Sequence, residues 1–443
     1  MGPGFRMNHW VLMVLLGLFT FVVGGLESKL ALILYDSGVY NLQNRRSASP
    51  EVRKMLDGLE SKYGLELVFK EYSDEDLTLF NGDVALYRDL VLLPSSKKYS
   101  GNKSLFGEKQ MVDFMEQEGN ILVVSSSSTT LPKEVSVFLN EIGIYPSPKG
   151  YAYTDYFDAD PKNPQLGSEN LCSQKVVTEL PNKIKYHGGA ALLSNNENVF
   201  PVLRGSKTSV TKVADDEVVT SGNTWTFGEQ GFPAVSFQAL NNARLSWVGS
   251  ESLLFPELIE WTLNKRNVLA LNFLQHFRND RPDKINTTIY KVNDQMIYMV
   301  GVSEFVNGKW IPYEVKDKED QLQLEFTMLN PYVRLNMLPL GPTVSSENAS
   351  ENDMFIYYSN FTIPDQYGVF TLNLDYRRYG LSYLSDKTVV TVRHLANYEY
   401  KRSWTITNSW LYIVSAILVV LAWLAFVVNF LNIGHVDTTK KKE

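Results

Sequence analysis

The stretch LALILY at residues 30–35 is apolar at every position, which is typical of a strand buried on both faces of a parallel sheet. Ser49 and Pro50 follow, and a serine N-cap with proline in the first turn predicts the start of a helix. The apolar residues of this segment fall on one helical face: Val52, Met55, Leu56, Leu59 and Tyr63. Gly64 marks the end of the helix, so the sequence predicts a strand followed by a helix.

Strand and helix signals continue to alternate up to residue 145. Apolar runs predict further strands at 65–69, 90–93 and 121–124, and apolar residues at helical spacing predict helices around 111–115 and 135–142. Strands that alternate with helices form a parallel sheet covered on both faces. We therefore expect a doubly wound α/β domain over residues 29–145.

The character of the sequence changes after residue 145. Residues 146–284 are rich in Gly, Asn, Ser and Thr and contain only short apolar segments, which predicts a mixed or mostly β middle domain. Stronger strand signals recur between turn residues over residues 285–400, and this spacing predicts an antiparallel β-sandwich close to the membrane. The expected fold class is α/β plus β, with one C-terminal transmembrane helix.

Two hydrophobic segments predict the topology. The first, at residues 10–23, follows Arg6 and precedes Gly24 and Gly25, which indicates a signal peptide over residues 1–25. The second, at residues 410–431, has no charged residue and would span about 33 Å as a helix, enough to cross a bilayer. We expect a type I membrane protein with most of its chain in the lumen.

The cytosolic tail, residues 432–443, ends in Lys440-Lys441-Lys442-Glu443. Lysines at these positions resemble the dilysine retrieval signal of endoplasmic-reticulum membrane proteins, and a plain stop-transfer charge cluster is the alternative. Within the membrane helix, small residues share roughly one face and an asparagine lies near its cytosolic end: Ser415, Ala422, Ala425 and Asn429. They either pack against a partner helix or reflect the ordinary composition of membrane helices.

Motifs for catalysis or cofactor binding are missing from the sequence. It has no P-loop, G-x-G-x-x-G, C-x-x-C, H-E-x-x-H or G-x-S-x-G motif. Its five histidines are scattered, and Cys172 has no second cysteine with which to form an internal disulfide. The net charge of −7 and the scattered Lys and Arg residues argue against nucleic acid as a partner. We predict no catalytic, cofactor-binding or metal-binding residue.

Two polar segments leave alternatives open. Asp158-Ala159-Asp160 resembles the D-x-D motif with which glycosyltransferases hold a metal, but nearby Pro161 and Asn163 also fit a solvated turn. The hydroxyl-rich stretch at residues 125–130 follows a buried strand, where an open α/β sheet can bind an anion. Its alternative role is a turn that caps the next helix.

Four N-x-S/T sequons occur, at Asn102, Asn286, Asn348 and Asn360. Chance alone predicts about this number for a chain of this composition, so the number is not informative. The expected lumenal location is what makes them candidate glycosylation sites.

Several longer stretches resemble one family from the first strand to the membrane helix. They are LILYD at 32–36, EGNIL at 118–122, FLNEIGIYPSPKG at 138–150, LNNARL at 240–245, PYVR at 331–334, PDQYGVF at 364–370 and RHLAN at 393–397. The chain is similar to the WBP/DDOST family, the non-catalytic subunit of the endoplasmic-reticulum oligosaccharyltransferase, and most similar to its fungal branch.

This resemblance implies an assembly role beside a separate multi-spanning catalytic subunit in a hetero-oligomer, and no catalytic residue is carried over. Two other functions remain as alternatives. One is a lumenal glycosyltransferase that uses Asp158 and Asp160, and the other is a type I cargo receptor, although no sustained heptad repeat is visible.

Overall fold

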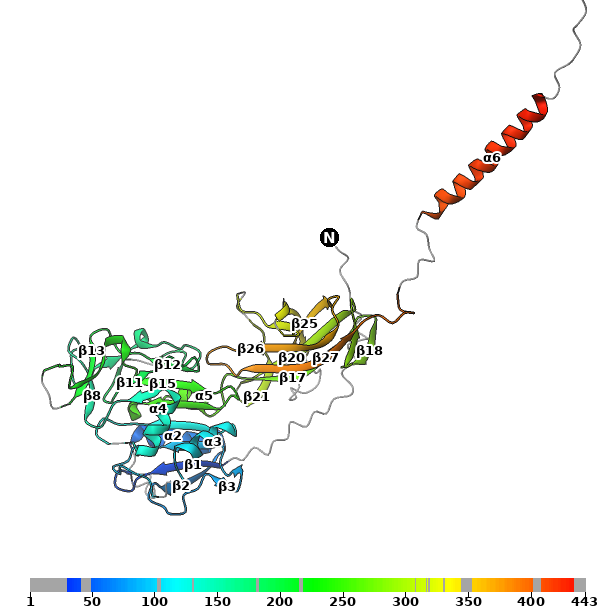
Figure 1. Ribbon diagram of the computed structural model, residues 1–443. Coiled ribbons are helices and arrows are strands. Elements are labelled where there is room, and N and C mark those ends of the chain that lie inside the picture. The colour runs from blue at the N-terminus through cyan, green and yellow to red at the C-terminus, as the bar shows by residue number, and fades with distance from the viewer. Residues whose placement is uncertain are drawn as a thin grey trace, which may run out of the picture.

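The computed structural model describes most of the chain between residues 30 and 433 (Figure 1). The described residues are 30–40, 49–101, 105–129, 131–180, 183–214, 218–306, 308–315, 317, 319–329, 331–343, 353–400 and 408–433. Several predicted features therefore lie outside the described residues: the signal peptide at 1–25, the sequons at Asn102 and Asn348, and the tail lysines Lys440 and Lys441.

A seven-stranded sheet forms the N-terminal part of the protein, in the order β12-β15-β16-β6-β5-β1-β2. Its strands are β1 (Leu30–Tyr35), β2 (Glu66–Glu71), β5 (Asp89–Leu92), β6 (Asn120–Val124), β12 (Val199–Leu203), β15 (Ala234–Gln238) and β16 (Arg244–Val248). The five strands from β16 to β2 are parallel, whereas β15 and β12 pair antiparallel. The expected run at 30–35 is thus a strand near one side of a mostly parallel sheet.

Helices cover both faces of this sheet. Side chains of α2 (Pro50–Ser61) and α5 (Pro256–Thr262) join Ile33 in one buried apolar cluster, and those of α3 (Glu108–Glu116) and α4 (Lys133–Ile142) join Leu32 in another. This division follows from the alternation of side chains along a strand. Local signals fix the helix ends as expected, because the Ser49 hydroxyl accepts a hydrogen bond from the Val52 backbone N–H and Gly143 ends α4 in the left-handed region.

The expected domain boundary at residue 145 lies inside this sheet. β12, β15 and β16 come from the segment 146–284, for which we expected a separate middle domain, and β16 pairs directly with β6. The rest of this segment forms small sheets on the same domain: β7 (Ile144–Pro146) with β11 (Ala191–Leu193), β9 (Gln165–Leu166) with β10 (Ile184–Lys185), and β8 (Tyr151–Asp155) with β13 (Ser209–Val213) and β14 (Thr224–Phe227). A short β3–β4 hairpin (Phe80–Asn81 and Val84–Ala85) precedes β5.

Two further sheets pack around a shared core in the C-terminal part of the described chain. The six-stranded sheet contains β17 (Val268–Arg278), β18 (Arg281–Ile285), β20 (Gln295–Val306), β21 (Lys309–Pro312), β24 (Leu338–Thr343) and β25 (Met354–Thr362). The five-stranded sheet contains β19 (Ile289–Lys291), β22 (Gln323–Thr327), β23 (Pro331–Asn336), β26 (Gly368–Tyr376) and β27 (Leu384–Arg393). All pairings in these sheets are antiparallel except that of β19 with β27, which is parallel.

The last described element is α6 (Ser409–Ile433). Within its 24 residues Ser409–Asn432, an 18-residue stretch has a mean hydropathy of 2.8 and is not buried against other parts of the protein. At 1.5 Å per residue the 24 residues are about 36 Å long, which exceeds the hydrocarbon thickness of a bilayer. Among the described residues it is the one helix long and apolar enough to cross a membrane.

Candidate functional site

The D-x-D carboxylates do not form a metal site. The Asp158 carboxylate accepts hydrogen bonds from the backbone N–H groups of Ala159 and Gln165, and Asp160 accepts one from the Asn163 side chain. Both side chains therefore shape a turn at the surface. Within the described part of the chain, no group of three or more His, Cys, Asp or Glu residues is arranged to hold a metal ion.

The carboxyl ends of β1 and β5 form the topological switch point of the parallel sheet, where open α/β sheets usually bind ligands. Asp36 follows β1 there and is 2% exposed. Its carboxylate accepts hydrogen bonds from the Ser96 N–H at 2.8 Å, the Gly38 N–H at 3.0 Å and the Ser95 hydroxyl at 3.1 Å. Burial opposes ionisation, but the hydrogen bonds from Ser96, Gly38 and Ser95 outweigh it and lower the Asp36 pKa to about 2. The protein's own donors thus occupy this carboxylate.

The hydroxyl-rich stretch after β6 is likewise bonded within the protein. The Ser125 hydroxyl accepts a hydrogen bond from the indole N–H of Trp247 at 2.8 Å, and the Ser127 hydroxyl lies 3.1 Å from His187 Nε2. The expectation that this stretch caps the next helix is wrong, because the N-cap of α4 is Pro132 and no side chain caps it. These serines connect loops around the carboxyl end of the sheet instead.

A second extensively bonded buried polar side chain is one that the sequence did not single out. Arg244, at the start of β16, is fully buried. Its guanidinium donates hydrogen bonds to the carbonyls of Trp261, Arg266 and Asn267 at 2.7–2.9 Å and to the Ser382 hydroxyl at 3.1 Å. It also stacks 4.6 Å from the Trp261 ring centre. Burial lowers the Arg244 pKa, and no described carboxylate pairs with it.

Neighbouring side chains fasten the same two parts of the protein together. The Asn242 amide donates to the Tyr383 carbonyl at 3.0 Å and accepts from the Tyr383 N–H at 2.6 Å. Gln238 donates to the Leu381 carbonyl, and the Trp261 indole donates to the Gly380 carbonyl. We call these contacts the domain junction, because they bind the β26–β27 connection to the end of the N-terminal domain.

The stretch LNNARL at 240–245 supplies Asn242 and Arg244 to this junction, and Asn241 donates to the last carbonyls of α3. The sequence signal for this junction was a group of three polar residues just before and within a buried strand. The partner of Asn242, Tyr383, lies about 140 residues away in the chain, so no local pattern could identify it.

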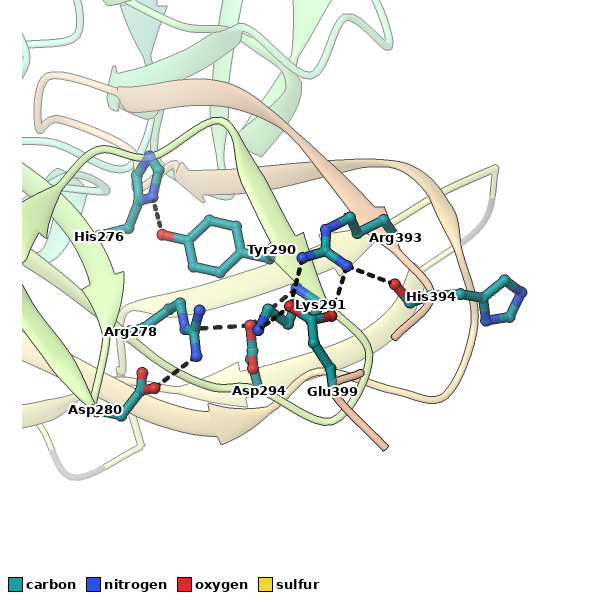
Figure 2. A network of polar contacts seen from close by, with 9 residues as sticks. All are labelled: His276, Arg278, Asp280, Tyr290, Lys291, Asp294, Arg393, His394 and Glu399. Carbon is teal, nitrogen blue, oxygen red and sulfur yellow. Dashed lines mark hydrogen bonds and ion pairs between the residues drawn. The ribbon is translucent and has the colours of Figure 1, made fainter. Parts of the chain in front are cut away.

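A second polar network lies where the chain leaves the C-terminal sheets (Figure 2). Glu399 accepts two hydrogen bonds from the Arg393 guanidinium at 2.8–2.9 Å and pairs with Lys291 at 2.6 Å. The Arg393 and Lys291 contacts hold the pKa of Glu399 well below its usual range. Arg278 pairs with Asp280 and Asp294, which joins β17 to the same end of the domain. The network anchors the segment that leads to α6.

Behind this network, His276 Nδ1 lies 2.8 Å from the Tyr290 hydroxyl. His276 is 2% exposed, and its desolvation lowers the pKa of the imidazole to about 4. Among the described residues, no carboxylate pairs with the imidazole. His276 is therefore a neutral histidine in the protein core at neutral pH.

The two sequons in the described residues are both exposed. Asn360 lies near the end of β25, opposite Ile297, and Asn286 follows β18. The Asn286 side-chain carbonyl accepts a hydrogen bond from the His276 N–H at 3.0 Å, which leaves its amide nitrogen directed away from that contact. Asn286 also borders a pocket of about 490 Å³ that Arg278, Arg281 and Lys284 line.

The helix residues and the cysteine have simple surroundings. Ser415, Ala422, Ala425 and Asn429 are all exposed on α6, and the Ser415 hydroxyl donates to the Tyr412 carbonyl of the same helix. Cys172 is a free, exposed thiol.

The chain matches two family models that together cover most of its length. These are the OST48 N-terminal domain at residues 26–280 and the OST48 middle domain at residues 276–434. The chain belongs to the OST48 family. The resemblance to the WBP/DDOST family is confirmed, and the OST48 boundary near residues 276–280 falls within and just after β17, so it agrees with the seven-stranded sheet as one domain.

Curated relatives of this OST48-family chain include three named subunits of dolichyl-diphosphooligosaccharide–protein glycosyltransferase. The subunit WBP1 of Saccharomyces cerevisiae is 36% identical, over 95% of this chain and 96% of its own. The wbp1 subunit of Schizosaccharomyces pombe is 27% identical, over 74% and 78% of the two chains. The 48 kDa subunit of Danio rerio is 27% identical, over 83% and 86%.

A comparison of folds matches a solved structure, the mmIFT52 N-terminal domain, over 52% of this chain and 92% of that one. Its TM-score is 0.34 at 11% identity, so this likeness carries no argument about fold or function.

Proposed function

We propose that this chain is an accessory, non-catalytic subunit of the oligosaccharyltransferase, which transfers a lipid-linked oligosaccharide to Asn in N-x-S/T sequences. The observation that carries the proposal is the end-to-end match to WBP1, at 36% identity over 95% of the chain. The active site belongs to a separate multi-spanning subunit of the hetero-oligomer. This chain needs no cofactor, metal or nucleic acid for its role.

The geometry of the described residues supports a scaffold. Arg244, through Ser382, and Asn242, through Tyr383, fasten the two folded domains to each other, and Glu399 anchors the base of the segment that leads to α6. Multiple hydrogen bonds from two planar groups restrict relative motion of the domains. A rigid body with one membrane helix is suited to holding other subunits in position.

The proposed location is the endoplasmic-reticulum membrane, with a cleaved signal peptide at residues 1–25, a lumenal body and a cytosolic tail from residue 432. Lys440 and Lys441 act as the retrieval signal. A reporter that carries only the membrane helix and the tail separates this signal from retention by partner subunits. Changing both lysines to Ser should release the reporter to the cell surface, and a reporter that stays in the endoplasmic reticulum would show that these lysines are not the signal.

The central experiment is purification of the tagged full chain in mild detergent. Multi-spanning subunits and transferase activity toward an N-x-T peptide should co-purify with the chain. The chain freed of its partners should have no activity. An isolated chain that glycosylates the peptide, or one that recovers no multi-spanning subunit, would overturn the proposed function.

The two alternatives are not favoured. The named relatives are transferase subunits, which argues against a cargo receptor. The Asp158 and Asp160 carboxylates already accept hydrogen bonds within a surface turn, which argues against a metal-dependent glycosyltransferase. Changing both aspartates to Ala should leave the activity of the purified complex within about threefold, because neither touches a metal site. A loss of several orders of magnitude in an intact complex would instead favour the glycosyltransferase alternative.

A further inference from the structure

The outer face of the five-stranded sheet carries exposed aliphatic side chains on neighbouring strands. Val369 on β26 and Val389 on β27 are each 57% exposed, and Ile289 on β19 is 60% exposed. The strand register places Thr371 opposite Val389, and it places Thr391 between Val369 and Ile289. We call these five residues the aliphatic patch.

Charged side chains border the aliphatic patch at both ends of the same face. One row further along the strands in one direction, Glu325 pairs with Arg334 at 2.5 Å and accepts a hydrogen bond from Asn373, and Lys387 lies opposite Asn373. The row beyond the patch in the other direction contains Lys291 and Arg393. The two rows of the aliphatic patch contain no charge and carry three exposed aliphatic side chains, which suits contact with an uncharged surface.

The two described sequons lie on the other sheet or beside the patch. Asn360 is exposed near the end of β25, a strand of the six-stranded sheet. Asn286 lies in the connection from β18 to β19, at the side of the aliphatic patch. No sequon lies on β22, β23, β26 or β27. A bulky, hydrated glycan excludes close protein contact, so the glycan-free sheet is the one open to a protein partner.

The aliphatic patch also lies at the membrane-directed end of the domain. Lys291 and Arg393 are the next residues after it on β19 and β27, and Glu399 binds both. Eight residues, 401–408, lie between Tyr400 and Ser409, the first residue of α6, so this end lies within roughly 30 Å of the membrane helix. A partner that covers the patch must itself be close to the membrane.

We propose that the aliphatic patch is the lumenal docking surface for another membrane-anchored subunit of the same transferase, which presents an uncharged, apolar surface to it. This assignment rests on the proposed function and names the face on which that assembly occurs. Val369 and Val389 form its centre, because they lie on the strands away from the Asn286 connection.

The sequence allows a direct test with an introduced glycan. Val389→Asn creates N-V-T at 389–391 and Val369→Asn creates N-F-T at 369–371, each with a single substitution. Each tagged variant is expressed beside an untagged wild-type copy, so that the cell keeps an active transferase, and its glycan is verified by the mobility shift that a glycosidase removes. Recovery of the multi-spanning subunits should fall about tenfold, because the glycan stands between the two surfaces.

Matched variants separate the glycan from its side effects. Val389→Asn combined with Thr391→Val has the same polar substitution without a sequon, so it should recover clearly more partner than the glycosylated Val389→Asn variant does. Asn360→Gln removes a sequon from the other sheet and should leave recovery unchanged. Val369→Lys with Val389→Glu tests the patch without any glycan and should weaken recovery in the same way.

Three outcomes would overturn the assignment. The first is wild-type recovery of partners by the glycosylated variants, which would place docking elsewhere. If no glycan is added, wild-type recovery by the charged double variant has the same meaning. Equal loss in the sequon-free control would point to misfolding rather than docking. Loss only of a differently tagged second copy of this chain would mean that the patch mediates self-association. Failure of the wild-type chain to recover any subunit would overturn the proposed function instead.

Discussion

Arg244 is an arginine that no carboxylate neutralises in the described structure, yet it is fully buried. Backbone carbonyls of Trp261, Arg266 and Asn267 provide the partial negative charge that replaces its hydration. Such charge-assisted hydrogen bonds are worth about 1.5–3 kcal/mol each when measured by removal. The guanidinium therefore fixes the position of the segment that leads from α5 to β17, residues 263–267. An apolar side chain of similar volume would leave these carbonyls without the hydrogen bonds from Arg244.

His276 predicts a dependence of stability on pH. Its pKa is lowered to about 4 in the folded protein, whereas an unfolded histidine titrates near 6.5. At pH 7 both states are neutral, and as the pH falls below about 6.5 only the unfolded state takes up a proton. Folding is therefore destabilised by about 2 kcal/mol between pH 7 and pH 5, and the loss is complete below about pH 4.

The non-titrating variant His276→Gln isolates this effect. The difference in the free energy of urea unfolding between wild type and variant should shrink by about 2 kcal/mol from pH 7 to pH 5. Tryptophan fluorescence of the full chain in mild detergent provides the measurement. A difference that stays constant over this range would mean that His276 has the same pKa in the folded and unfolded protein.

Among the helices and strands, the sequence was sufficient to predict those features that depend only on neighbouring residues. The Ser49-Pro50 start of α2 and the Gly143 end of α4 follow from caps and backbone conformation, and the apolar run at 30–35 is a buried strand. The pairing of β16 with β6 joins residues more than 120 positions apart, and the sequence pattern of β16 does not predict which strand it pairs with. The same limit explains the boundary expected at residue 145 and the parallel pairing of β19 with β27.

The membrane helix offers a test at this scale. Ser415 and Ala422 lie seven residues apart on one face of α6, and small residues let a neighbouring backbone approach closely. Changing both to Leu keeps the helix apolar but should weaken recovery of partner subunits several-fold, equivalent to roughly 1 kcal/mol. Asn429, near the same face, can add an interhelical hydrogen bond.

The control for this helix uses the same spacing on the opposite face. Val420 and Val427 are also seven residues apart, and changing both to Leu adds bulk there. Recovery should remain at the wild-type level. If both double variants recover partners equally, α6 is an anchor only and assembly depends on the domains that precede it.

For the whole molecule, the domain junction decides whether the two domains before α6 act as one body. Contacts from Gln238, Asn242, Arg244 and Trp261 all reach the short β26–β27 connection, residues 377–383. The N-terminal domain thereby holds one end of the C-terminal sheets, while the Glu399 network holds the other end at the chain's exit toward α6. The β-strands between these two ends therefore connect the N-terminal domain to the exit of the chain.

Gly380 allows this coupling to be tested with a matched control. Its φ of +79° is strained for an L-residue, and an added Cβ would lie 2.9 Å from the Lys175 Cβ of the N-terminal domain. Gly308 has nearly the same φ, +81°, but an added Cβ there would meet nothing within 4 Å. Gly308→Ala should therefore cost only the backbone strain, about 1–2 kcal/mol. Gly380→Ala should cost more, because the clash forces the junction apart and weakens the hydrogen bond from Trp261 to the Gly380 carbonyl.

In urea, Gly380→Ala should separate the unfolding of the two domains into two transitions and expose the 264–267 segment to protease, whereas Gly308→Ala should do neither. Identical behaviour of the two variants, or two unfolding transitions already in the wild type, would show that the contact at Gly380 does not hold the two domains together as a single rigid body.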